Sequence, residues 1–237
     1  MRILGIDTSN LVSSVALADE TRVLGEWTTN LNKNHSIRLM DSISMLLDEL
    51  DVAPEDLDGI AVAHGPGSYT GVRIGVSAAK SMGWSLGVPV VGVSSLKVVA
   101  MNALGFDGPI IPLFDARRGQ VYTGCYRSRS FGLLEETLTE RIILLRDWLP
   151  MVVEQADHKP ILFLGEDLRL HKETIEEVVG EQAVFAPVSF QHPRAAHIAI
   201  MGAQLLTEAG NIHELVPEYL QVAEAEAKWL ATQEQKK

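Results

Sequence analysis

The sequence His64-Gly-Pro-Gly-Ser-Tyr-Thr-Gly-Val-Arg73 decides the fold. It follows a strand-like apolar segment, residues 59–63, and it precedes a long apolar segment, residues 72–86. Its glycines allow backbone angles that are closed to other residues, and Pro66 stiffens the turn. A strand, a glycine-rich turn and a helix start present free backbone N–H groups. The segment therefore predicts either an anion site or a tight packing joint.

The helix predicted after this turn, residues 70–86, has unusually small side chains. Glycine inside a helix costs ~1 kcal/mol relative to alanine, so close approach of another element must compensate. Between residues 72 and 86 only Arg73 and Lys80 are charged. This helix is expected either to be buried between the sheet and another element or to form a subunit interface. We favour the interface, at which Gly75 and Ala79 would allow a partner to approach closely.

Hydrophobic periodicity outward from this segment predicts the same order of elements twice. The first half is expected to contain strands 2–7, 12–18, 23–29, 59–63 and 90–93, with helices 36–50, 70–86 and 94–104. The second half is expected to contain strands 110–114, 121–126, 137–144, 161–164 and 183–185, with helices 147–156, 168–179 and 193–209.

A duplicated βββαβαβα unit is the α/β architecture of the actin-like (ASKHA, ribonuclease H-like) fold, which has two lobes. The expected domains are an N-terminal lobe, 1–105, a C-terminal lobe, 106–210, and a helical tail, 211–237. Proteins of this architecture bind ATP between their lobes, which makes a small-molecule kinase or ATPase acting alone one hypothesis for function.

The composition limits the partners that the chain can hold by itself. Its 237 residues carry a formal net charge of −11, whereas binding nucleic acid needs clustered Lys and Arg. One cysteine, Cys125, excludes an internal disulfide. No apolar run approaches the ~18–20 residues of a membrane span, and Arg2 is charged too early for a signal peptide. We expect a cytoplasmic protein.

Two turns stand where nucleotide phosphates would bind in the actin-like fold. Asp7-Thr8-Ser9 and Asp115-Ala-Arg-Arg-Gly119 each follow the first strand of a half, but neither has glycine two places after its aspartate. Asp7, Thr8, Ser9 and Asp115 either contact a nucleotide or only cap their turns through local hydrogen bonds. Arg117 and Arg118 either pair with a phosphate or a partner's carboxylate, or stay solvated.

Neither a metal site nor a catalytic group is predicted. No two of the seven histidines are four residues apart, and Leu39 stands where His35 would need a partner. The sequence contains no Gly-x-Ser-x-Gly elbow and no catalytic triad. These absences argue against a metalloprotease.

The segment Gly65-Pro-Gly-Ser-Tyr-Thr-Gly-Val-Arg-Ile-Gly75 closely resembles the bacterial TsaB (YeaZ) family. The resemblance continues at Ile3-Leu-Gly-Ile-Asp-Thr-Ser9, Asn34-His-Ser36, Asp115-Ala-Arg-Arg-Gly-Gln-Val-Tyr122 and Pro217-Glu-Tyr-Leu220, so it spans nearly the whole chain. It implies the actin-like fold and a role in making N6-threonylcarbamoyladenosine. The modified base is the adenosine 3′ of the anticodon in tRNAs that read codons beginning with A.

The resemblance also implies partners. In that family the paralogue TsaD is catalytic and holds a metal through two histidines four residues apart. TsaB pairs with TsaD through the helices after the opening strands and the glycine turn, the ATPase TsaE joins them, and TsaB alone forms homodimers through the same face. The chain would thus be a non-catalytic scaffold that meets tRNA only within the complex and binds no cofactor firmly. ATP or ADP at the subunit interface is left open. The interface residues implied are His35, Gly65, Pro66, Gly67, Ser68, Tyr69, Thr70, Gly71, Arg73, Gly75 and Ala79.

Overall fold

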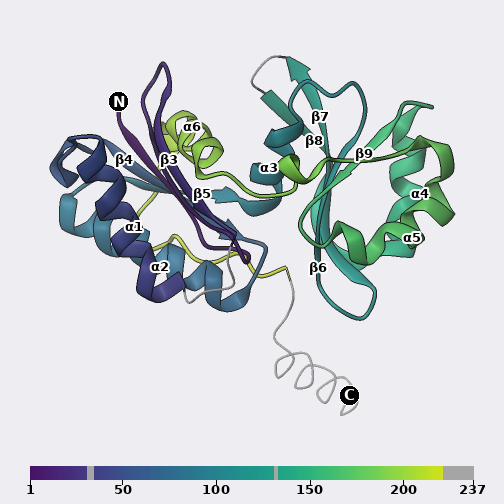
Figure 1. The fold of residues 1–237 in the computed structure, drawn as a ribbon, viewed down its shortest axis with the longest axis horizontal. Helices are drawn as coiled ribbons and strands as arrows, with labels where there is room; N and C mark the ends of the chain where they lie inside the picture. The colour runs from purple at the N-terminus through teal and green to yellow at the C-terminus, as the bar shows by residue number, and fades with distance from the viewer. Residues whose placement is uncertain (31–34, 131–132, 221–237) are drawn as a thin grey trace, which may run out of the picture.

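The computed structural model describes residues 1–30, 35–130 and 133–220, which form two lobes around two five-stranded mixed sheets (Figure 1). The first sheet has the order β3-β2-β1-β4-β5, and the second has the order β10-β9-β6-β7-β8. The strands of the first sheet are β1 (Ile3–Asp7), β2 (Ser13–Ala18), β3 (Val23–Thr29), β4 (Gly59–Gly65) and β5 (Val90–Ser94). Those of the second are β6 (Ile110–Asp115), β7 (Gln120–Ser130), β8 (Leu133–Leu144), β9 (Ile161–Leu164) and β10 (Ala183–Phe185).

The two sheets share one topology. In each, the first strand pairs antiparallel with the second and parallel with the fourth, so that Ile6 lies opposite both Val15 and Val62. Strand β1 is buried along its whole length, as the central strand of a sheet covered on both faces must be. The duplicated α/β actin-like fold predicted from the sequence is confirmed.

Two pairs of helices cover the outer faces of the sheets. Helices α1 (His35–Glu49) and α2 (Tyr69–Leu86) pack on the first sheet, and α4 (Leu145–Ala156) and α5 (Leu168–Val179) pack on the second (Figure 1). On α1 the buried residues Leu39, Ile43 and Leu46 are three or four places apart, which gives the helix one apolar face. Each layer encloses its own hydrophobic core.

The two remaining helices are exchanged between the lobes. Helix α3 (Ser95–Ala100) follows the first sheet in sequence but packs on β6 and β7, whereas α6 (Ala195–Leu205) returns to β1, β2 and β4. The return is close, because a Cβ built on Gly5 would lie 2.3 Å from the carbonyl oxygen of Ala195. The helix expected at 193–209 therefore belongs to the second half by sequence and to the first sheet by contact.

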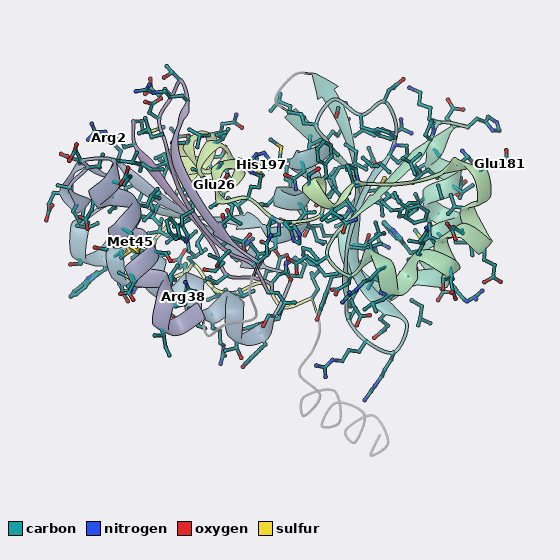
Figure 2. All side chains as sticks on the ribbon, in the orientation of Figure 1. Arg2, Glu26, Arg38, Met45, Glu181 and His197 are labelled. Carbon is teal, nitrogen blue, oxygen red and sulfur yellow. The ribbon has the colours of Figure 1, made fainter. Side chains whose placement is uncertain are left out.

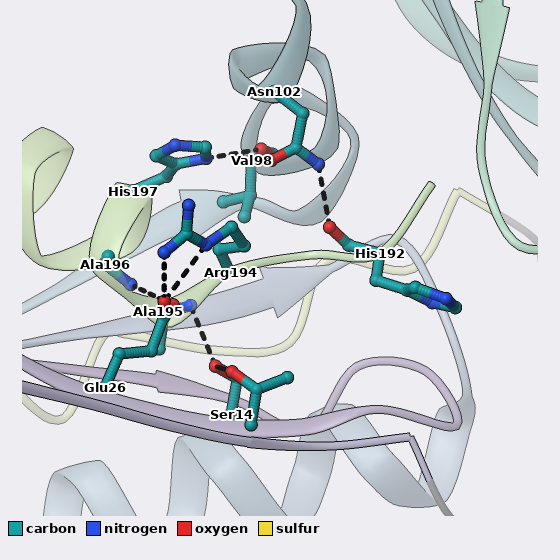
Figure 3. A network of polar contacts seen from close by, with 10 residues as sticks. Ser14, Glu26, Val98, Asn102, His192, Arg194, Ala195, Ala196 and His197 are labelled. Carbon is teal, nitrogen blue, oxygen red and sulfur yellow. Dashed lines mark hydrogen bonds and ion pairs between the residues drawn. The ribbon is translucent and has the colours of Figure 1, made fainter. Parts of the chain in front are cut away.

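A polar network holds the start of α6 against the first sheet (Figure 3). Glu26 on β3 accepts a hydrogen bond from the N–H of Ala196 at 3.1 Å and pairs with Arg194, while its own side chain is only 13% exposed. The hydroxyl of Ser14 accepts from the N–H of Ala195 at 3.0 Å. Two side chains from β2 and β3 thus satisfy the first N–H groups of α6, in the role of a helix cap.

A third hydrophobic core lies between the two sheets. It joins residues of β4 and β5, such as Ala63 and Val93, to residues of β6 and β9, such as Phe114 and Leu164, with α3 and α6 packed among them. The lobes therefore share buried apolar surface.

The predicted boundaries differ from those of the structure by a few residues at most, in both halves. Strands β7 and β8 extend beyond the predicted 121–126 and 137–144. The helix predicted at 94–104 ends as an α-helix at Ala100. Five short 3₁₀ segments were not predicted: η1 (Pro54–Asp56), η2 (Met101–Ala103), η3 (Gly180–Gln182), η4 (Val188–Phe190) and η5 (Leu206–Glu208). Within the three described ranges, no helix is long and apolar enough to cross a membrane.

Candidate partner-binding site at the glycine turn

The glycine turn, residues 65–71, joins β4 to α2. Gly65 has φ of 123°, which favours glycine, and its peptide bond to Pro66 is cis. The hydroxyl of Ser68 accepts a hydrogen bond from the N–H of Gly71 at 3.3 Å and so caps α2. The N–H of Ser68 donates to the carbonyl oxygen of Ser9 at 2.7 Å, which ties this turn to the one after β1.

The glycines of this segment are explained by contacts inside the chain. A Cβ on Gly71 would lie 2.1 Å from the carbonyl oxygen of Thr8, and a Cβ on Gly67 would lie 2.3 Å from that of Ser9. A Cβ on Gly75 would lie 2.6 Å from Oγ1 of Thr8. No real Cβ approaches another heavy atom so closely, so α2 needs glycine here to reach the β1 turn. Of the two predicted alternatives, the structure supports the packing joint.

The Asp7-Thr8-Ser9 turn is buried beneath this joint. The hydroxyl of Thr8 donates to the carbonyl oxygen of Gly71 at 2.7 Å, and Oδ1 of Asp7 accepts from both the N–H and the hydroxyl of Ser9. Oδ2 of Asp7 is buried without a hydrogen-bond partner among the described residues. Burial raises the pKa of Asp7 to about 6, although the bonds from Ser9 oppose the shift. The groups expected to face a nucleotide are thus engaged with their own chain or enclosed by it.

The equivalent turn of the second lobe is open and charged. Asp115 lies 3.1 Å from Nε2 of His171, and its N–H donates to Asp167 at 2.9 Å. Arg117 and Arg118 are exposed at the tip of the turn, with φ of 67° and 55°. Asp167 thus places a second carboxylate beside Asp115 at the base of the turn, while the neighbouring Glu166 pairs with His192 at 3.0 Å.

The predicted interface residues divide into an exposed and a buried group. Ser68, Tyr69, Thr70 and Arg73 are exposed, and Gly67 is half-buried. The other five glycine-turn and helix residues are buried in the chain itself: Gly65, Pro66, Gly71, Gly75 and Ala79. His35 begins α1, but its side chain lies outside the described residues.

The outer face of the α1–α2 layer carries large exposed apolar side chains. Ile37, Met40 and Met45 on α1 are 69%, 49% and 52% exposed, and Met45 projects from α1 beside Arg38 in Figure 2. Tyr69 and Trp84 on α2 are 55% and 74% exposed. Large exposed apolar groups gathered on one helical layer are typical of a protein–protein interface.

Residues 211–220, which we call the C-terminal strap, run from the end of η5 back across α2 and the glycine turn. The N–H of Glu218 donates to the carbonyl oxygen of His64 at 2.7 Å. A Cβ on Gly65 would lie 2.5 Å from the carbonyl oxygen of Glu218. The strap thus packs directly on the joint. It contains no helix, which differs from the helical tail expected over 211–237; residues 221–237 of that tail lie outside the described residues.

Both cations of α2 contact the strap. Nζ of Lys80 donates to the carbonyl oxygens of His213 and Leu215, at 3.1 and 2.7 Å, and Nε of Arg73 donates to the hydroxyl of Tyr219 at 2.7 Å. No role for Lys80 or Tyr219 was predicted from the sequence. The sequence carried one signal for this contact. Arg73 and Lys80 are isolated cations on a helix of small and apolar residues, and such cations need hydrogen-bond acceptors from a neighbouring segment.

Other candidate sites in the described part of the chain are weaker. No group of three or more His, Cys, Asp and Glu side chains there is placed to hold a metal ion. Two hollows of about 310 and 190 Å³ lie along the strap, and neither is lined by Asp7 or Asp115. Cys125 is buried in β7, where burial raises the pKa of its thiol and keeps it unreactive.

Comparisons with known proteins point to the proteins of tRNA threonylcarbamoyladenosine formation. The sequence model of the family described as TsaD, tRNA N6-adenosine threonylcarbamoyltransferase, matches residues 22–229. The tRNA threonylcarbamoyladenosine biosynthesis protein TsaB of Bacillus subtilis is 49% identical over 98% of this chain and all of that protein. TsaB of Escherichia coli is 32% identical over 60% of this chain and 62% of that protein. The crystal structure of YeaZ from Pseudomonas aeruginosa, 28% identical, aligns with a TM-score of 0.79 over 92% of this chain and 99% of its own.

Proposed function

The chain belongs to the TsaB family of tRNA threonylcarbamoyladenosine biosynthesis proteins, and on that premise we propose that it is the non-catalytic scaffold subunit of a tRNA N6-threonylcarbamoyladenosine transferase complex. The catalytic partner is a TsaD subunit, bound as a heterodimer, and TsaE joins the pair. The complex modifies the adenosine 3′ of the anticodon in cytoplasmic tRNAs that read codons beginning with A.

The observation that carries the proposal is the exposed apolar face of α1 and α2. Ile37, Met40 and Trp84 are exposed on this layer, and burial against a partner would remove their apolar surface from water. Tyr69 and Arg73, exposed near the start of α2, belong to the same helical layer. We therefore assign the TsaD contact, and the homodimer of the isolated chain, to the α1–α2 layer.

The charge of the chain supports a role in which another subunit holds the tRNA. A net charge of −11 repels a polyanion, so binding of tRNA by this chain alone would need a basic patch strong enough to overcome it. The open Arg117–Arg118 turn is a small exception to the acidic surface. We therefore place tRNA contact only within the complex.

The alternative, a kinase or ATPase that acts alone, has less support. Thr8 and Ser9 use their hydroxyls inside the chain, and two carboxylates lie at the base of the second turn, where a phosphate would be repelled without a metal. Calorimetry of the isolated chain with Mg-ATP separates the two hypotheses. Tight binding followed by turnover would favour the enzyme, and heats equal to dilution favour the scaffold.

Reconstitution tests the proposal itself. TsaD, TsaE, threonylcarbamoyl-adenylate and unmodified tRNA are combined with and without this chain, and modified adenosine is measured after nuclease digestion. We expect modification to depend on the chain. Equal modification in its absence would contradict the scaffold function.

A further inference from the structure

The exposed start of α2 holds a guanidinium against two tyrosine rings. Cζ of Arg73 lies 4.2 Å from the ring centre of Tyr69 and 5.9 Å from that of Tyr219. The two rings stack on each other with their centres 5.1 Å apart and an angle of 27° between their planes. With the bond from Nε of Arg73 to the hydroxyl of Tyr219, this cluster fixes the guanidinium at the surface.

In the part of the chain that the structure describes, some exposed arginines pair with a carboxylate and others, such as Arg117 and Arg118, do not; Arg73 belongs to the second group, but its guanidinium is packed against two rings. Arg129 pairs with Glu135 and Arg146 with Glu177, whereas within the described ranges no carboxylate forms an ion pair with Arg73. Its Nε donates to the hydroxyl of Tyr219, and Tyr69 also interacts with the guanidinium through its hydroxyl and its ring. The terminal nitrogens form the fork that matches a carboxylate in two parallel bonds.

The surroundings of the cluster suit a protein partner. Tyr69 is 55% exposed and Tyr219 is 45% exposed, and Tyr69 also belongs to the apolar layer proposed to bind TsaD. Tyrosine and arginine are enriched among the residues that dominate binding energies. Since stacking already orders this guanidinium, less side-chain freedom is lost when it binds.

We propose that Arg73 is an anchor that receives a side-chain carboxylate of the partner subunit, and that Tyr219 is the positioning residue that completes the anchor. The inference rests on the proposed function, since the partner in question is TsaD. It assigns a role to the strap: a segment from the end of the chain finishes a binding site at the start of α2.

Affinity for TsaD tests the anchor directly. Arg73→Gln is expected to raise the dissociation constant for TsaD at least about tenfold, because arginines are frequent among the residues that dominate binding energies. It is also expected to make the affinity less dependent on salt concentration. Arg73→Lys keeps the charge but loses the fork, so it is expected to restore only part of the affinity. Arg146→Gln removes a paired arginine from the second lobe and is the control that should bind like the wild type.

A double-mutant cycle tests the positioning role of Tyr219. Tyr219→Ala is expected to weaken TsaD binding about fivefold in the wild-type background and to have no further effect in Arg73→Gln, because neighbouring groups couple. Tyr219→Phe keeps the stacked ring and loses the hydrogen bond, so its effect is expected to be smaller. If Tyr219→Ala weakens binding equally in both backgrounds, Tyr219 does not act through Arg73.

The outcomes for the anchor and for the scaffold function are distinguishable. A wild-type chain that fails to bind TsaD would contradict the proposed function. A wild-type chain that binds, together with a folded Arg73→Gln variant of equal affinity, would overturn the anchor alone. An Arg73→Gln variant that changes only self-association would also overturn it, since the carboxylate would then belong to a second copy of this chain. Thermal unfolding monitored by circular dichroism confirms that each variant is folded.

Discussion

The two lobes have the same sheet topology and equivalent helical layers, but the layers differ in what they expose. On α1 and α2 five large hydrophobic side chains are at least 49% exposed: Ile37, Met40, Met45, Tyr69 and Trp84. On α4 and α5, both fully described, the corresponding exposed side chain is Leu170, at 61%. Since the fold is shared, it does not itself require an apolar outer face.

The difference indicates which helical layer is suited to be covered by another subunit. The second lobe shows that a layer of this topology can present mainly polar groups to solvent. The apolar face of the first lobe is therefore not required by the fold, and burial against another subunit, as proposed above, would give a physical reason for it. The turns after the first strand of each sheet also differ. The glycine joint covers the Asp7 turn, whereas the Asp115 turn is open to solvent.

The largest effect on stability is expected from a substitution in the glycine turn, which packs α2 against the β1 turn. Gly71→Ala places a methyl group 2.1 Å from the carbonyl oxygen of Thr8, so α2 must move away from the β1 turn. We expect the free energy of unfolding to fall by about 3 kcal/mol, the upper range for overpacking. Urea denaturation measures it.

Gly210→Ala is the matched control for this substitution. No atom lies within 4 Å of a Cβ built on Gly210, so the change is expected to stay within about 0.5 kcal/mol. Equal stability of the two variants would show that the glycine turn is not a tight joint.

Asp7 and Asp115 end the equivalent strands β1 and β6, and the dependence of stability on pH is expected to distinguish the two turns. The pKa of Asp7 is raised from 3.8 to about 6 by burial. Between these values the folded chain keeps the proton that the unfolded chain has released, so stability falls as pH rises through this window and stays low above it. The span is at most about 3 kcal/mol, since one pKa unit corresponds to about 1.4 kcal/mol.

Urea midpoints measured from pH 4 to pH 7 check this prediction. Asp7→Asn is expected to reduce the fall in stability of the wild type across the window. The raised pKa of Glu140, caused mainly by burial, contributes a fall of the same sign in both proteins. Identical profiles for Asp7→Asn and wild type would place the pH dependence elsewhere, and Asp115→Asn shows whether the sealed turn is special.

A smaller effect is expected where the exchanged helix α6 meets the first sheet. Glu26→Gln weakens the pair in which Glu26 is largely buried and Arg194 is half exposed, while it keeps an acceptor for the N–H of Ala196. We expect a loss of about 2 kcal/mol, because hydrogen bonds to charged groups contribute about 1.5–3 kcal/mol.

Glu177→Gln provides the comparison in the second lobe. Glu177 pairs with Arg146 at the surface, where both side chains are more than half exposed, so the change is expected to stay below about 1 kcal/mol. Similar losses in the two variants, measured by denaturation, would mean that the network around Glu26 does not hold α6 in place.

Local patterns predicted most elements of the fold but little of how they assemble. Buried strands such as β1 and β9 and the amphipathic helix α1 follow directly from apolar periodicity. Strands β7 and β8 extend into residues 127–130 and 133–136, where charged side chains interrupt that pattern. Nothing local could predict that α6 packs on the first sheet, since periodicity says which face is apolar and not which sheet covers it.

The candidate site was predictable in part for the same reason. The spacing of Gly65, Gly67 and Gly71 indicates a close approach, but only the structure identifies the atoms approached as the carbonyls of Ser9 and Thr8 and of Glu218. The strap has no periodicity and is held by backbone carbonyls, which carry no signal in a sequence. Its contact with Arg73 depends on two segments that are 146 residues apart.

The affinity of two surface variants for TsaD tests the central claim most directly. Ile37→Asp combined with Met40→Asp introduces two charges into the apolar layer of the first lobe, and Leu170→Asp introduces one into the equivalent layer of the second. We expect the double variant to bind TsaD at least about 100-fold more weakly, while Leu170→Asp binds like the wild type. A folded double variant with unchanged affinity would show that the α1–α2 layer is not the partner-binding surface.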